Sequence, residues 1–223
     1  MKTYSVLAVI CLAFGFVSHG ATYEELKADI LADVASTNRE ARLAVTNRVD
    51  GLISLAPSTE ETNTCKLIKA RVLSECADIT GEEEIYDGRA YGMVTNLCWS
   101  VLQSSLSRPD SWQRYGSVFC LVEPLSMDGR HETIFGIATN ALAAADSQNA
   151  VSVDTHTWTV LFGAESLQLQ GIKEHMRTLA AVSLSMSDRN ADISAYTNGL
   201  PTRLLEVIRA IRGQPLAVLD IGE

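Results

Sequence analysis

The segment CKLIKARVLSECADI, residues 65–79, carries the pattern that decides the fold. Its apolar side chains recur at every third or fourth position, which places them on one face of an α-helix. These positions are Cys65, Ile68, Val72, Cys76 and Ile79. The segment is therefore predicted to be a helix that buries this face against the rest of the chain.

The same period continues on both sides of this segment. We expect residues 22–55 to form one long helix or two collinear helices. Further helices are predicted at 58–80, 88–106, 111–123, 131–146, 154–170, 172–186, 188–198 and 201–212. The alternating segment 151–153 is too short for a strand. The predicted fold class is all-α, with stacked antiparallel helical hairpins, of which a short HEAT-like solenoid is one form.

Capping residues support the predicted helix starts. Thr22 with Glu25, and Ser58 with Glu61, both match the capping-box pattern in which side chains satisfy the first backbone N–H groups. Pro57 separates the two helices that these boxes introduce.

Proline and glycine give the other boundaries. Pro124 and the pair Asp128-Gly129 are expected to break the helix that begins at Ser111. Gly171 is expected to interrupt or bend the helix that begins at Asp154. Pro201 and Gly213 bracket the last helix, following the usual preference for proline at the start and glycine past the end.

Two hexamers resemble each other, YGMVTN at 91–96 and FGIATN at 135–140. Their spacing falls within the period of ~40–47 residues of HEAT and armadillo repeats. Each contains an aromatic-glycine pair, as do residues 115–116 and 162–163. Because glycine costs ~1 kcal/mol inside a helix, we predict that these glycines allow close helix packing. They are Gly92, Gly116, Gly136 and Gly163. The alternative is that such short pairs recur by chance.

The first residues have the layout of a secretory signal peptide. Lys2 precedes an apolar run from Val6 to Val17, and small residues flank a cleavage position before Ala21. A membrane anchor is the alternative, although the run is shorter than the ~20 apolar residues that a bilayer requires. We expect export to the periplasm or the medium after removal of residues 1–20. Residues 21–223 are then predicted to form a single helical domain, in which an N-terminal hairpin, 21–82, packs on the rest.

The charge of the chain excludes several classes of partner. Its formal net charge is −9, and no basic cluster stands out in the sequence. Nucleic acids and anionic lipid surfaces both reward lysine and arginine patches, so neither is expected as a partner. No later segment is apolar enough to span a membrane. The sequence contains no Asn-x-Ser/Thr glycosylation site, which mildly favours a bacterial origin.

Four cysteines follow the signal segment: Cys65, Cys76, Cys98 and Cys120. The turn at Pro109 lies midway between the last two, so an antiparallel hairpin brings them level, and we predict a Cys98–Cys120 disulfide in the exported chain. The first two are roughly 16 Å apart on one helix and cannot pair. The alternative is that all four are buried thiols.

No catalytic or metal motif is present, and neither a metal nor a cofactor is expected. Groups such as Asp128, His131 and Glu132, or the acidic run 82–84, are more typical of solvated helix ends and loops. Among Trp99, Trp112 and Trp158, any exposed ring would be the first place to look for a binding groove.

These observations favour an exported, non-catalytic binding or scaffold protein with a protein or peptide partner. The alternative is an exported hydrolase on a helical scaffold. It would require a cleft that gathers two or more acidic or histidine side chains with perturbed pKa values. The candidates are Asp87, Glu123, Asp154, His156 and His175. A structural envelope protein is a third hypothesis.

Overall fold

The computed structural model describes residues 22–36, 38–77, 88–148, 152–163 and 169–213. These residues form ten helices and no strand, so the all-α prediction is confirmed. The helices are α2 (Tyr23–Ala35), α3 (Arg39–Leu55), α4 (Thr59–Ala77), α5 (Gly88–Ser104), α6 (Trp112–Met127), α7 (His131–Asp146), α8 (Thr155–Phe162), α9 (Leu169–Ser187), α10 (Ser194–Thr197) and α11 (Thr202–Ile211). The predicted signal peptide, the acidic run 82–84 and Asp87 lie outside the described residues.

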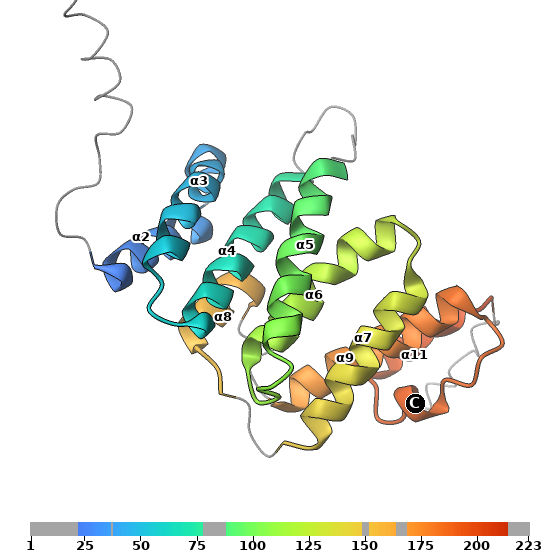
Figure 1. The fold of residues 1–223 in the computed structure, drawn as a ribbon. Coiled ribbons are helices and arrows are strands. Elements are labelled where there is room, and N and C mark those ends of the chain that lie inside the picture. The colour runs from blue at the N-terminus through green and yellow to red at the C-terminus, as the bar shows by residue number, and fades with distance from the viewer. Residues whose placement is uncertain (1–21, 37, 78–87, 149–151, 164–168, 214–223) are drawn as a thin grey trace, which may run out of the picture.

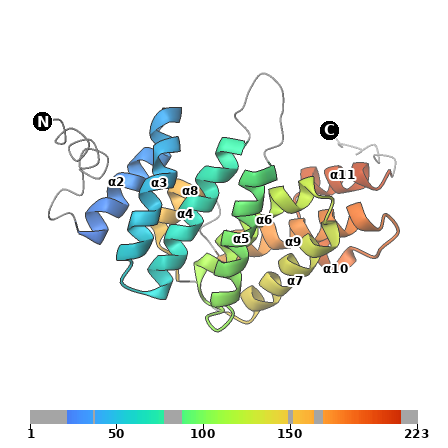
Figure 2. The ribbon, with the colours of Figure 1, turned by 45° about the horizontal axis from the view of Figure 1, so that its top comes forward.

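Most helices pack against their neighbours in the sequence, which builds the stack in Figure 1. In addition, α9 packs against α7, and α11 packs against α9. α8 returns to the N-terminal end of the stack and packs against α2. Figures 1 and 2 both show α8 behind α4. None of the described helices combines the length and the apolar character that a membrane crossing requires.

One main hydrophobic core runs through α2 to α9. At its centre the rings of Trp112 and Trp158 meet edge to face, with centroids 5.9 Å apart. Cys65, Ile68 and Val72, which the opening segment placed on one helix face, are fully buried in this core. Trp112 and Trp158 are therefore core residues rather than parts of an exposed binding surface.

Several helix starts follow the predicted capping. Thr22 and Glu25 form both bonds of a capping box at the start of α2. Asp154 accepts a hydrogen bond from the backbone N–H of Thr157 at the start of α8. Gly213 follows α11 with φ +66°, a conformation that favours glycine.

The prediction of one helix or two collinear helices over residues 22–55 is wrong. Ser36 has an extended backbone, and Asn38 caps α3 by accepting from the N–H groups of Glu40 and Ala41. The chain therefore turns, and α3 packs against α2, with an ion pair between Arg48 and Asp33.

Two predicted helix breaks also lie elsewhere. α6 continues through Pro124 to Met127, since proline removes only one backbone donor near the end of the helix. It ends at the other predicted break, where Asp128 is the C-cap and Gly129 has φ +67°. Gly171 lies in the first turn of α9, and the preceding helix ends instead at Gly163, where φ is +85°.

The helix predicted from Asp188 to Gly199 is reduced to α10. The carboxylates of Asp188 and Asp192 accept hydrogen bonds from the backbone N–H groups of Asn190 and Ser194. Such local side-chain bonds favour turns over helix, so residues 188–192 form turns.

The four glycines of the aromatic-glycine pairs differ in their surroundings. A Cβ atom at Gly116 would lie 3.1 Å from both Leu67 and Phe162, so this glycine permits a close approach. At Gly92 and Gly136 no described atom lies within 4 Å of that position, so close packing does not account for these two. Gly163 serves the turn after α8 rather than a helix interior.

Candidate functional site

A groove of about 610 Å³ lies between α5 and α7, near the start of α6. Both helices pack against α6 but make few contacts with each other (Figure 1). Trp99 and Leu102 on α5 are partly buried, whereas Ile137 and Ala141 on α7 are buried. The apolar part of the lining consists of Trp99, Leu102, Leu106, Ile137 and Ala141. Leu106 is 59% exposed.

The helical period explains how α5 supplies both the core and the groove. Val94, Cys98 and Val101 point into the core. Trp99 and Leu102 follow at a different angle around the same helix and face α7. An exposed tryptophan ring is expected to mark a binding groove. Of the three tryptophans, the partly buried Trp99 is the one that lines this groove.

Arg114 brings a positive charge to this otherwise apolar groove. Its Nε atom is buried and has no hydrogen-bond partner, and its guanidinium forms no ion pair with any described residue. The amides of Gln103 and Asn140 and the hydroxyl of Thr133 line the same groove. A guanidinium binds a carboxylate through two parallel hydrogen bonds, so the groove can hold an apolar group that carries a carboxylate.

Gly136 lies in the wall of the groove, within the second hexamer. Because no described atom lies within 4 Å of its missing Cβ, the glycine leaves room at this point. Two features of the sequence, Trp99 and the second hexamer, lie at this groove, but no pattern identified Arg114 or Gln103. Their relation to the groove depends on the distance between α5 and α7, which the helical period does not determine.

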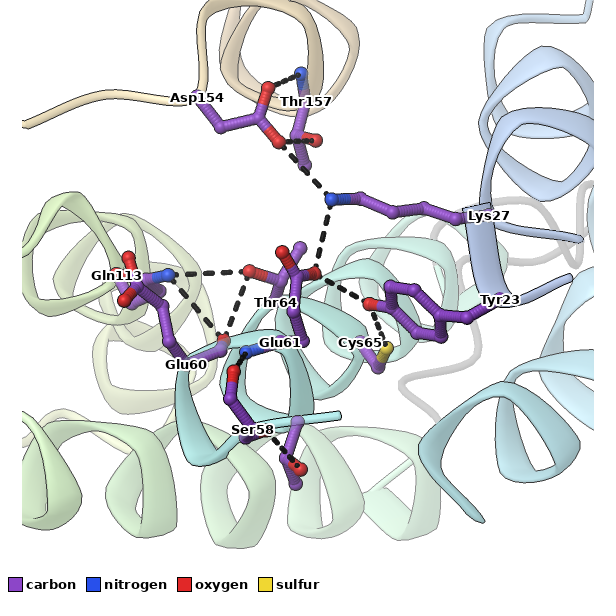
Figure 3. A network of polar contacts seen from close by, with 11 residues as sticks. Tyr23, Lys27, Ser58, Glu60, Glu61, Thr64, Cys65, Gln113, Asp154 and Thr157 are labelled. Carbon is purple, nitrogen blue, oxygen red and sulfur yellow. Dashed lines mark hydrogen bonds and ion pairs between the residues drawn. The ribbon is translucent and has the colours of Figure 1, made fainter. Parts of the chain in front are cut away.

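A second polar cluster joins α2, α4 and α8 (Figure 3). Lys27 is only 8% exposed, and its Nζ donates to Glu61 at 3.1 Å and to Asp154 at 3.3 Å. The hydroxyl of Tyr23 donates to the same Glu61 carboxylate at 2.5 Å and lies 3.4 Å from the sulfur of Cys65. Glu61 therefore joins α4 to α2, although the sequence placed it in a capping box.

The charges of this cluster compensate one another. Burial lowers the pKa of Lys27, but the hydrogen bond and charge of Glu61, together with Asp154, raise it above its ordinary value. Burial raises the pKa of Asp154, but hydrogen bonds from Thr157 and the charge of Lys27 outweigh it and lower the pKa. Burial and hydrogen bonds with Cys65 and Glu61 raise the pKa of Tyr23.

The cluster has the properties of a structural connection rather than of a catalytic site. Cys65 is fully buried, and burial raises the pKa of its thiol, so the reactive thiolate is disfavoured. Lys27 is engaged on both sides by carboxylates, and neither it nor its partners line the groove between α5 and α7.

The acidic and histidine residues proposed for a hydrolase do not come together in the described part of the chain. Glu123 accepts hydrogen bonds from Ser74 and Tyr91, whereas Asp154 belongs to the Lys27 cluster. His156 is exposed. His175 stacks on Phe119, with ring centroids 4.0 Å apart. The described residues also include no group of three side chains that could hold a metal ion.

The two cysteines of the predicted disulfide lie close together. Cys98 on α5 and Cys120 on α6 are both buried, and the structure describes both as thiols. A hydrogen bond with Cys120, together with burial, raises the pKa of Cys98 well above its ordinary value. The hairpin thus brings the sulfurs into contact, and their oxidation in the exported chain stays a prediction.

No protein-family model, curated protein or solved structure matches this chain. The geometry and chemistry of the groove therefore carry the functional proposal.

Proposed function

We propose that this chain is an exported, non-catalytic binding protein that holds a peptide segment of a partner protein between α5 and α7. The observation that carries the proposal is the unpaired Arg114 guanidinium in an apolar groove. A buried polar nitrogen without a partner costs free energy, and a ligand that pairs with it recovers that cost on binding. The apolar lining supplies the remaining affinity by removing surface from water.

The ligand expected from this lining is a peptide with apolar side chains and a nearby carboxylate. Trp99, Leu102 and the exposed Leu106 offer a surface for the apolar side chains. Arg114 pairs with the carboxylate, while the amides of Gln103 and Asn140 are placed to bind backbone groups. The hydrolase alternative is not carried further, because no observation on its candidate residues favours it.

A groove-filling substitution tests the proposal. A pool of N-acetylated tetrapeptides that contain leucine, isoleucine or phenylalanine and end in a free carboxylate serves as the probe. Gly136→Trp is expected to weaken binding more than tenfold in fluorescence anisotropy, because the indole occupies the room at Gly136. The added Cβ meets no described atom within 4 Å outside its own stretch of helix, and circular dichroism checks that the variant folds.

Gly51→Trp is the matched control. Gly51 is also a helix-interior glycine with no described atom within 4 Å of its Cβ position, but it lies on α3 and lines no part of this groove. This variant should bind the pool as the wild type does. Equal binding by the Gly136→Trp variant, equal binding of carboxamide-terminated peptides, or no binding at all would each refute the proposal.

A further inference from the structure

A second groove lies on the other flank of α5. It has a volume of about 280 Å³ and separates α4 from α5. Lys66 and Lys69 line it from α4. The side chains from α5 are Met93, Asn96, Leu97 and Ser100.

The two grooves open on neighbouring parts of one surface. In a helix successive side chains are rotated by about 100°, so residues three or four apart share a flank. Met93, Asn96 and Leu97 thus form one flank of α5, whereas Trp99, Leu102 and Leu106 form another. The buried residues of α5 lie between these flanks on the core side. On the solvent side, α5 is therefore a ridge between the two grooves.

The two hexamers occupy equivalent places at these grooves. Met93 and Asn96 are the third and sixth residues of the first hexamer, and Ile137 and Asn140 those of the second. Met93 and Asn96 line the groove between α4 and α5. Ile137 and Asn140 line the groove between α5 and α7.

The hexamers also share a local hydrogen bond. The hydroxyl of Thr95 donates to the carbonyl of Tyr91 at 2.8 Å, and that of Thr139 donates to Phe135 at 2.9 Å. Both asparagines are exposed, and neither side-chain amide has a hydrogen-bond partner among the described residues. The threonine and asparagine positions of the two hexamers thus correspond, whereas Met93 is exposed and Ile137 is buried.

We infer that the two grooves together bind one extended, acidic peptide segment that crosses α5. The inference rests on the proposed function and extends its ligand from one groove to two. An asparagine amide offers one donor group and one acceptor, which match the N–H and C=O of an extended backbone. Adjacent helices lie roughly 8–10 Å apart, so a segment of about eight residues spans both grooves.

The charges of the surface select the acidic segment. Lys66 donates to the hydroxyl of Ser100 at 2.7 Å but has no carboxylate partner in the described ranges. Arg114 in the other groove forms no ion pair there either. Lys69 in the first of these grooves is already paired with Asp50 at 2.6 Å. Lys66 and Arg114 are therefore the cations that can complement aspartate or glutamate of the partner.

Three pools of synthetic octapeptides test the inference. Apolar residues alternate with aspartate or glutamate in the first pool, with lysine or arginine in the second, and with serine in the third. The acidic pool is expected to bind at least tenfold more tightly than the other two. Asn96→Ala and Lys66→Glu are each expected to weaken its binding about tenfold, while tetrapeptide binding between α5 and α7 stays unchanged.

Asn47→Ala is the matched control. Asn47 is an exposed asparagine that also follows a threonine on a helix, α3, and lines neither groove. Alanine favours helix more than asparagine does, so both alanine variants should fold, as circular dichroism would check.

The outcomes separate the two proposals. If Asn96→Ala and Lys66→Glu bind the acidic octapeptides as the wild type does, the two-groove inference is overturned and the proposed function stands. Preferential binding of the basic or serine pool overturns the inference as well. If the tetrapeptides also fail to bind, the proposed function fails and the inference fails with it.

Discussion

His175 shows how a single side chain can be placed by neighbours that are distant in sequence. It stacks on Phe119 of α6, and the same phenylalanine meets Trp158 of α8 edge to face at 5.5 Å. Burial lowers the pKa of His175 to about 4, and no charged neighbour contributes to this shift. The folded chain therefore holds a neutral imidazole at pH values where a free histidine would bind a proton.

This pKa predicts an acid-sensitive stability. Between pH 6.5 and 4 the unfolded chain binds a proton at His175 that the folded chain does not, so the free energy of unfolding falls as the pH decreases. We expect a loss of about 2 kcal/mol from this residue between pH 7.5 and 5. Urea denaturation at the two pH values measures it.

The control variant for this prediction is His175→Phe, which preserves a ring on Phe119 but cannot titrate. Its free energy of unfolding should fall less over the same pH interval. The same decrease in both proteins would show that other groups cause the pH dependence.

The apolar period of the sequence does not predict that His175 is covered by an aromatic ring. Helical periodicity identifies the face that is most apolar, but a histidine beside that face is covered when an aromatic ring from another helix reaches it. Arg114 illustrates the same limit. Its significance comes from an unpaired atom in a groove, and pairing is a property of the folded chain.

At the scale of elements, the sequence predicts which residues form helices better than it predicts where one helix ends and the next begins. The helix 131–146 agrees with α7, because its start and its apolar period are both local properties. The turn between α2 and α3 was not predicted, because the apolar stripe continues across it. Asn38 gave the available signal, as a residue that favours helix starts inside a segment assumed to be continuous.

The hairpin of α5 and α6 predicts a disulfide under oxidising conditions. Cys98 and Cys120 are already in contact, so their oxidation requires little rearrangement of the two helices. We expect the exported, non-reduced protein to yield a Cys98–Cys120 linked peptide on digestion and mass spectrometry. Reduction of this link should lower the free energy of unfolding by about 3 kcal/mol, for a loop of this size.

The intact mass of the same sample checks the predicted cleavage before Ala21. Alkylation of both cysteines in the denatured but unreduced protein would contradict the disulfide. A mass that includes residues 1–20 would contradict cleavage of the signal peptide.

At the scale of the whole molecule, α8 is the feature that sequence order could not predict. A stack of helices in chain order would place α8 beside α7 and α9, but it lies against α2. Lys27 and Asp154 are far apart in the sequence, and their ion pair forms only because the chain returns. Capping and periodicity describe each of these helices separately and carry no information about this contact.

We expect Lys27 to hold α2 and α8 onto α4 through its ion pairs with Glu61 and Asp154. In Lys27→Met the carboxylates of Glu61 and Asp154 lose their cation, while the apolar stem is kept. Both carboxylates are partly exposed, so the free energy of unfolding should fall by about 2 kcal/mol rather than the full cost of a buried charge. Asp154→Asn keeps a side-chain cap on α8 and leaves Lys27 paired with Glu61, so it should cost less than about 1 kcal/mol.

Lys173→Met is the matched control for this change, because Lys173 pairs with one carboxylate, Asp146, that is 49% exposed. Urea denaturation of the three variants gives the comparison, and hydrogen exchange of α2 reports where the loss occurs. Faster exchange confined to α2 and α8 in Lys27→Met would support the connection, because the rest of the core does not depend on this lysine. If Lys27→Met and Lys173→Met unfold at the same urea concentration, the cluster holds the helices no more strongly than a surface ion pair.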